Sequence, residues 1–450
     1  MKTAIALISS IVLGSLALSA AAASPPTTER VSVSSAGAQG DWNTFAAGIS
    51  ADGRYVVLNS QARNLVPGDT NDRWDVFVRD RSTGQTNRVS VTSSGAQAEA
   101  GPDPFGGSTE GAISASGRYV VFVSDAPNLV AGDTNRTRDI FLHDRSTGAT
   151  TRVSVSSSGR QANGSSEFPA ISADGRFVAF QSLATSLVAQ DTNGLSDVFV
   201  RDLRTGRTTR VSLNSRGKQA RCNLDYCEST QPVLSAHGRY VAFQSSATNL
   251  VPHDTNRLGD VFVRDRRTGK TTRVSVDSHG RQGGRDRTNN GSNAPAISAS
   301  GRYVAFHSAD SNLVRGDTNR TFDIFVHDRR NGRTTRVSVG DHGQQANGEN
   351  LGPASISSDG RYVAFASLAS NLVAGDANDI TDVFVRDLVG GRTILASLGD
   401  HGQQGDDGSW PAAVAFSAND RYLAFSSWAA NLVPGDTNRW ADAFVRDFGQ

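Results

Sequence analysis

One short phrase returns along the whole chain and limits what the chain can fold into. "ISADGRYVV" at Ile49 has near copies that begin at Ile113, Ile171, Leu234, Ile297, Ile356 and Phe416. The spacing is about 60 residues, and each copy is followed by "NLV" or a variant, then "DTN" or "DAN", then "DxFxxD". Repetition at such a period indicates one structural unit per repeat, stacked against its neighbours.

Each repeat predicts four strands. In the third, these are Phe168–Ser172, Arg176–Ser182, Asp197–Asp202 and Thr208–Leu213, with turns at "ADG" and Thr-Gly. The second strand is apolar on both faces, which is typical of a strand sandwiched between neighbouring sheets. With no helical periodicity, the pattern predicts an all-β, seven-bladed β-propeller with four antiparallel strands per blade. A linear array of β modules is the alternative.

The two ends of the chain favour the ring. "TTERVSVSSAGAQG" near the N-terminus reads as a fourth strand without a preceding third, and "DAFVRDFGQ" at the C-terminus reads as a third strand without a following fourth. We therefore expect the N-terminal strand to complete the last blade through Val31 and Val33, which would remove the open edges. A linear array would need capping repeats, and none is evident.

The first residues predict export. Lys2 precedes the apolar stretch Ala4–Leu18, and small residues for cleavage follow in "SAAAAS". We expect a signal peptide at 1–23, a single propeller domain at 24–450, and a secreted, cell-surface or periplasmic protein. An N-terminal membrane anchor is the alternative, but the run is short for a span and lacks a basic flank. No other segment reads as transmembrane.

Cys222 and Cys227 are the two cysteines, in the polar loop "CNLDYC". In an exported protein such a pair predicts a local disulfide. Half of a metal site is the alternative, although no second cysteine pair is present to complete it.

The balance of charges bears on whether nucleic acid is a partner. The chain has 45 basic and 44 acidic residues and a formal net charge of +1. This balance gives no reason to expect a nucleic-acid partner. We expect a monomer.

The repeat resembles the WD40-like repeats in the propeller of TolB. The resemblance rests on the "SADG" first turns at Ser50–Gly53 and Ser172–Gly175, the apolar "AF" strand, and strands that end in Asp80, Asp144, Asp202, Asp265, Asp328, Asp387 and Asp447. It covers Arg30–Gln450 and implies a propeller without the additional α/β domain of TolB. Because propellers host many functions, it implies no activity.

A ring of Asp and Asn residues lies in the long loops between the second and third strands. Oxygen-bearing side chains at positions 1, 3 and 7 are similar to those of calcium loops, so calcium is a candidate cofactor. The alternative is that these side chains fix the turn by accepting backbone N–H bonds, which repetition in every blade favours. The candidate ligands are Asp69, Asn71, Asp75, Asp133, Asn135, Asp139, Asp191, Asn193, Asp197, Asp254, Asn256, Asp260, Asp317, Asn319, Asp323, Asp376, Asn378, Asp382, Asp436, Asn438 and Asp442.

No catalytic motif stands out. The sequence contains no Gly-x-Ser-x-Gly, His-Glu-x-x-His or P-loop. It therefore predicts a binding module for an extracellular protein, peptide or glycan, with no evident catalytic activity. The alternative is a metal-dependent polysaccharide lyase or another carbohydrate-active propeller enzyme. It would need His, Gln or acidic side chains clustered at the channel mouth, and His307 is one candidate.

Overall fold

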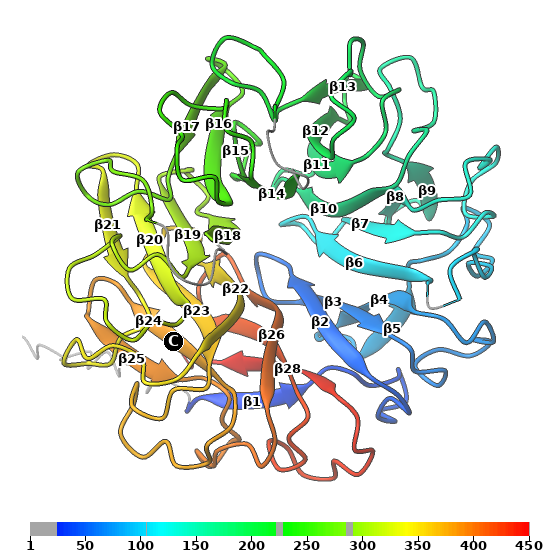
Figure 1. Ribbon diagram of the computed structural model, residues 1–450. Coiled ribbons are helices and arrows are strands. Elements are labelled where there is room, and N and C mark those ends of the chain that lie inside the picture. The colour runs from blue at the N-terminus through cyan, green and yellow to red at the C-terminus, as the bar shows by residue number, and fades with distance from the viewer. Residues whose placement is uncertain (1–24, 105, 222–227, 285–290, 450) are drawn as a thin grey trace, which may run out of the picture.

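The strands form seven sheets arranged in a ring around a central axis (Figure 1). The computed structural model describes residues 25–104, 106–221, 228–284 and 291–449. Each sheet has four antiparallel strands, so the predicted all-β, seven-bladed propeller is confirmed. The signal peptide at 1–23 and the disulfide between Cys222 and Cys227 lie outside the described residues and stay predictions.

The blades follow the chain in order, with the first strand of each blade innermost. Blades 1 to 3 contain β2 (Thr44–Ile49), β3 (Tyr55–Ser60), β4 (Asp75–Asp80), β5 (Gln85–Arg88); β6 (Ser108–Ile113), β7 (Tyr119–Ser124), β8 (Asp139–Asp144), β9 (Ala149–Arg152); and β10 (Ser166–Ile171), β11 (Phe177–Ser182), β12 (Asp197–Asp202), β13 (Arg207–Arg210). Blades 4 to 6 contain β14 (Ser229–Leu234), β15 (Tyr240–Ser245), β16 (Asp260–Asp265), β17 (Lys270–Arg273); β18 (Ser292–Ile297), β19 (Tyr303–Ser308), β20 (Asp323–Asp328), β21 (Arg333–Arg336); and β22 (Asn350–Ile356), β23 (Tyr362–Ser367), β24 (Asp382–Asp387), β25 (Arg392–Leu395). Blade 7 contains β26 (Ser409–Phe416), β27 (Tyr422–Ser427), β28 (Asp442–Asp447) and the N-terminal β1 (Thr27–Arg30).

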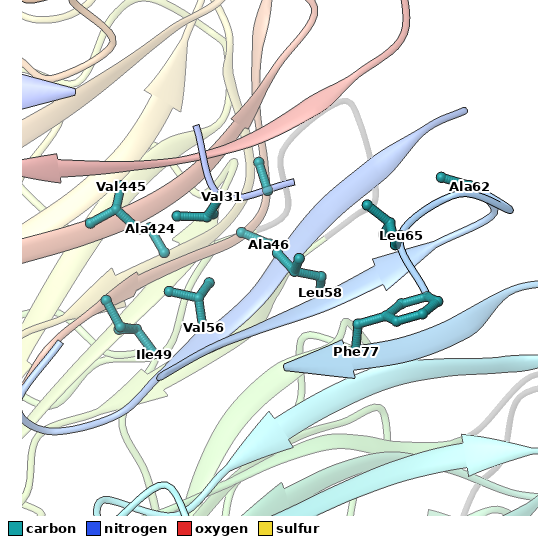
Figure 2. Close-up of a cluster of buried hydrophobic side chains, with 11 residues drawn as sticks. Val31, Ala46, Ile49, Val56, Leu58, Ala62, Leu65, Phe77, Ala424 and Val445 are labelled. Carbon is teal, nitrogen blue, oxygen red and sulfur yellow. The ribbon is translucent and has the colours of Figure 1, made fainter. Parts of the chain in front are cut away.

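The ring is closed by β1, as predicted. It pairs with β28 from Thr27 opposite Asp447 to Arg30 opposite Phe444. The paired strand begins earlier than predicted, and Val33 lies beyond it in a bridge to Gln39. Val31 is fully buried and packs with side chains of blades 7 and 1 in the cluster of Figure 2.

The fourth strands end about three residues before the predicted limit, and a serine hydroxyl explains why. In blade 3, β13 ends at Arg210, and Val198 N–H then donates to Oγ of Ser212 at 3.1 Å. The hydroxyl replaces a backbone carbonyl in the ladder, because Ser side chains compete for backbone hydrogen bonds. The same Ser-to-third-strand bond recurs in the other blades.

The face with the tight turns is held by ion pairs within each blade. Arg54, which follows the first turn, donates to both carboxylate oxygens of Asp80 at 2.8 and 2.7 Å. The equivalent pair forms in all seven blades, which accounts for the strands that end in Asp. The longer loops lie on the opposite face, which we call the long-loop face.

No helix in the described part of the chain is long and apolar enough to cross a membrane.

Candidate active site

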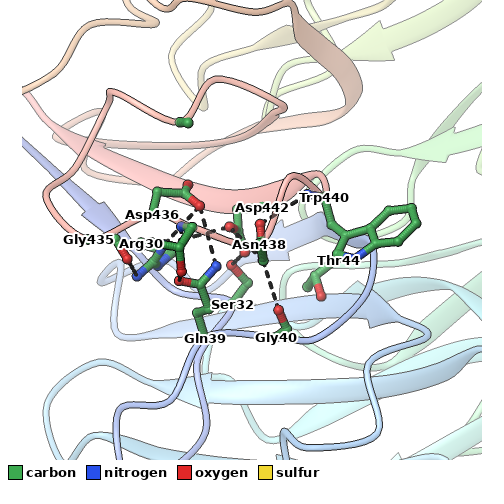
Figure 3. Close-up of polar contacts among 12 residues, drawn as sticks. Arg30, Ser32, Gln39, Gly40, Thr44, Gly435, Asp436, Asn438, Trp440 and Asp442 are labelled. Carbon is green, nitrogen blue, oxygen red and sulfur yellow. Dashed lines mark hydrogen bonds and ion pairs between the residues drawn. The ribbon is translucent and has the colours of Figure 1, made fainter.

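The Asp and Asn residues of the long loops form a polar cluster in each blade. In blade 7 (Figure 3), Asn438 Nδ2 donates to Asp442 at 3.2 Å and to the carbonyl of Gly40 at 2.8 Å. Arg30 lies 3.3 Å from Asp436 and 3.8 Å from Asp442. The guanidinium thus lies between the two carboxylates.

In six blades an arginine pairs with the first Asp of the cluster in this way. These arginines are Arg30, Arg88, Arg152, Arg210, Arg273 and Arg336. Blade 6 differs, because Leu395 occupies the equivalent position of β25. Within the described ranges, Asp376 and Asp382 form no ion pair, and burial raises the pKa of both carboxyls. The proposed calcium ligands are therefore neutralised by arginine in six blades, and calcium binding stays a prediction.

The innermost strands, which surround the axis of the ring, contain residues in a left-handed backbone conformation. In five blades the innermost strand is bulged and its third residue has φ between 49° and 63°. These residues are Glu110, Phe168, Gln231, Ala294 and Gly352. A left-handed conformation is costly for residues other than Gly, and such strain concentrates at functional sites. Each is the third residue of the first strand of its blade, near the end of the strand that joins the long-loop face, yet the side chains differ from blade to blade.

Glu110 is the acidic member of this set. Its Oε2 accepts a hydrogen bond from the backbone N–H of Phe168 at 2.6 Å, so its carboxyl reaches the neighbouring blade. Beside it, Arg138 lies 3.4 Å from Glu167 and 2.9 Å from Asp103. The guanidinium of Arg138 thus pairs with the carboxylates of Glu167 and Asp103, and its charge acts on the carboxyl of Glu110.

The surroundings of Glu110 alter its proton affinity. Burial raises the pKa of Glu110 to about 7, the backbone N–H of Phe168 opposes the rise, and the negative charge of Glu167 adds to it. A carboxyl with a pKa near neutrality holds its proton at pH 6 and releases it at pH 8, which suits general acid–base catalysis.

An aromatic patch borders this site in blades 7 and 1. It consists of Trp42, Phe45, Trp74, Trp428 and Trp440, all at the long-loop ends of strands. The rings of Trp42 and Trp440 stack at 4.1 Å, and Phe45 contacts Trp74 and Trp428 at 5.8 and 6.0 Å. The carbonyl of Trp74 accepts from Ser108 N–H at 2.7 Å, two residues before Glu110. Because Trp42 is 43% exposed, the patch offers an apolar surface to a ligand.

His307 does not fit a metal centre. Its Nε2–H donates to the carbonyl of Asn350 at 2.9 Å, its Nδ1 lies 3.2 Å from Oδ1 of Asn293, and its ring stacks on Phe322. Burial lowers the pKa of His307 to about 4. The described residues include no group of three His, Cys, Asp or Glu side chains that could hold a metal.

The sequence did not reveal Glu110, Arg138 or Glu167. Glu110 lies in a strand whose equivalents in blades 3 to 6 carry Phe, Gln, Ala or Gly at this position, and only its departure from the repeat signals it. The partners come from other segments, which the sequence alone does not bring together.

Comparison with known proteins rests on structure. No family model matches the sequence, and no curated protein matches it. An oligogalacturonate lyase determined in complex with manganese is 11% identical, with a TM-score of 0.51 over 95% of this chain and 94% of the lyase. An acylaminoacyl peptidase is 10% identical, with a TM-score of 0.51 over 90% of this chain and 51% of the peptidase. TolB from Acinetobacter baumannii is 15% identical, with a TM-score of 0.41 over 79% of this chain and 64% of TolB.

This chain is a seven-bladed propeller with TolB-like structural neighbours. It spans less than two thirds of that TolB and about half of the peptidase. The prediction of a binding module without catalytic activity is wrong against this comparison, because solved enzymes are among the structures that share the fold. The carbohydrate-active alternative is better supported, at the level of the fold.

Proposed function

We propose that the protein is a carbohydrate-active enzyme that cleaves glycosidic bonds at the channel mouth on its long-loop face. The observation that carries this proposal is the carboxyl of Glu110, with its pKa raised to about 7 beside Glu167 and Arg138. The substrate is an extracellular glycan, since residues 1–23 predict export. The aromatic patch supplies a surface on which the apolar faces of sugar rings can stack.

In hydrolysis, Glu110 in its acid form would donate its proton to the glycosidic oxygen as the bond to the sugar carbon breaks. Water would add to that carbon, and Glu167 would accept the proton released by the water. Two carboxyl groups with separate roles are the usual requirement of glycoside hydrolysis. A pKa near 7 keeps Glu110 protonated in weakly acidic and neutral solution.

Arg138 favours elimination as a second reaction type. A guanidinium pairs with carboxylates in a fixed geometry and can face the carboxylate of a uronate sugar. Ionised Glu110 would then remove the proton next to that carboxylate, the electron pair would form a C=C bond, and the bond to the oxygen of the leaving sugar would break. That oxygen would take up a proton from water or from the newly protonated Glu110, so that the leaving sugar departs as an alcohol. The fold similarity to oligogalacturonate lyase adds support to this reaction type.

Glu110→Gln tests the proposal directly. We expect the purified protein to cleave at least one member of a panel of neutral and uronate oligosaccharides, and the variant to lose at least 100-fold in rate, the usual range for a general acid–base group. Ultraviolet absorbance of an unsaturated product identifies elimination, and new reducing ends without it identify hydrolysis.

Thr109→Ser, which alters the preceding residue without removing a charge, is the matched control and should keep its rate. Equal rates for Glu110→Gln and the wild type would contradict the proposal, as would a panel on which the folded wild type cleaves nothing.

A further inference from the structure

A large groove lies on the outer side of blade 3, away from the channel. Its volume is about 1440 Å³, and the outermost strand β13 forms its floor. Its walls are the loop that contains Ser156–Arg160, the loop that contains Thr185–Thr192, and the loop from Leu213 to Arg221. All three loops belong to the long-loop face, so the groove opens on the same side as the candidate active site.

The groove is lined by positive charge. Arg160, Arg207, Lys218 and Arg221 line it, all four are exposed, and within the described ranges none of them forms an ion pair. The carboxylate of Asp191 also lies in the lining, but it is 2.9 Å from Arg210, which neutralises it. Four basic side chains therefore line the groove, and no ion pair with another described residue neutralises them.

The fold does not require these charges. At the positions of blade 1 that correspond to Arg160, Arg207, Lys218 and Arg221, the chain carries Ala38, Gln85, Ala96 and Glu99. The same strands and loops thus form with a net negative charge in blade 1. Blade 1 therefore shows that the fold forms without this basic set, although blade 4 carries basic residues at three of the four positions, Lys218, Lys270 and Arg281.

The composition of the walls selects the ligand class. The described lining contains no aromatic side chain. It is rich in hydroxyl-bearing residues, namely Ser156, Ser157, Ser158, Thr185, Ser186, Thr192, Thr208 and Thr209. Single-stranded nucleic acids need aromatic platforms on which bases stack, whereas carboxylate and sulfate groups pair directly with guanidinium and ammonium groups. We propose that this groove binds an acidic polysaccharide. The proposal does not depend on catalysis, because Glu110 lies on the innermost strand of another blade.

Binding of polygalacturonate and of dextran sulfate to the full chain tests this site, with neutral dextran as the uncharged comparison. We expect at least one acidic polymer to bind, to bind more weakly as salt increases, and to lose about tenfold in affinity in the triple variant Arg160→Ala, Lys218→Ala, Arg221→Ala. The matched control is Arg315→Ala, Arg330→Ala, Arg392→Ala, which removes the same charge from exposed positions of blades 5 and 6 and should change affinity less than twofold.

Equal losses in the two triple variants would overturn the proposal, as would unchanged affinity in the groove variant, or tighter binding of single-stranded DNA than of either acidic polymer. Binding of the polymers is measured as an affinity and cleavage as a rate, and the groove variant changes no residue of the candidate active site, so failure of the cleavage proposal and failure of this one give different results.

Discussion

Removal of residues 25–34 is expected to unfold the whole ring rather than blade 7 alone. The deletion takes away β1 and its pairing with β28, and it exposes the cluster in which Val31 is fully buried. Burial of Val31 contributes roughly 1.5–3 kcal/mol. Loss of Arg30 leaves the buried carboxylates of Asp436 and Asp442 without their counter-charge, which costs roughly a further 3–5 kcal/mol. The sum is comparable with the total stability of a typical domain.

Thermal unfolding followed by circular dichroism measures this effect. A deletion of residues 1–26, which leaves β1 intact, is the control and should unfold at the wild-type temperature. A synthetic peptide of residues 25–40 should restore folding of the shorter protein by occupying the open edge of β28. A deletion of 25–34 that keeps the wild-type melting temperature would show that β1 does not close the ring.

Arg88→Leu is expected to destabilise blade 1 by roughly 3 kcal/mol at pH 8. The guanidinium lies 3.0 Å from Asp69 and 3.2 Å from Asp75, and all three side chains are nearly inaccessible to solvent. Burial already raises the pKa of Asp75 to about 6 although Arg88 opposes the rise. Without Arg88 the pKa of Asp75 rises further. The loss of folding stability in Arg88→Leu is therefore largest above this raised pKa, where the carboxyl is charged. It becomes smaller as the pH falls to 5, because the carboxyl then takes up a proton.

Urea unfolding at pH 8 and pH 5 checks both the size and the sign of this effect. Blade 6 offers the reverse change, since Leu395→Arg places a guanidinium beside Asp376 and Asp382. We expect a smaller gain of about 1 kcal/mol there, because Leu395 already packs against the core. An Arg88→Leu protein as stable as the wild type at pH 8 would contradict the role given to this arginine.

The architecture was predictable because it depends on features that recur seven times. Turn residues, apolar strands and the Asp–Arg pairs appear in almost every copy, so each repeat supports the interpretation of the others. The strand limits were less predictable. The Ser212 hydroxyl takes the place of a backbone acceptor for Val198 N–H, and the sequence alone does not reveal this contact.

The candidate site was not predictable for the opposite reason. Glu110 occurs once, and its raised pKa depends on burial and on Phe168 and Glu167 of the next blade, 57 or 58 residues along the chain. Its left-handed backbone at φ 55° follows from a bulge that the alternation of residues does not reveal. The prediction of a binding module rested on the absence of catalytic motifs, and it is contradicted by the solved enzymes that share the fold.

The measurement that tests the central claim most directly is the stability of Glu110→Gln against pH. The ordinary pKa of Glu110 is 4.5 and the folded value is about 7, so the folded protein retains a proton that the unfolded chain has lost between these values. The charge on Glu110, whose side chain is half-buried, therefore lowers stability fully above pH 7 and not at all below about pH 4.5. Gln231 occupies the equivalent bulge of blade 4 at φ 51°, so the amide suits this backbone. We expect the variant to match the wild type at pH 4 and to exceed it by about 2 kcal/mol at pH 8. Equal stability at both pH values would show that Glu110 is an ordinary carboxylate and would contradict its proposed part in catalysis.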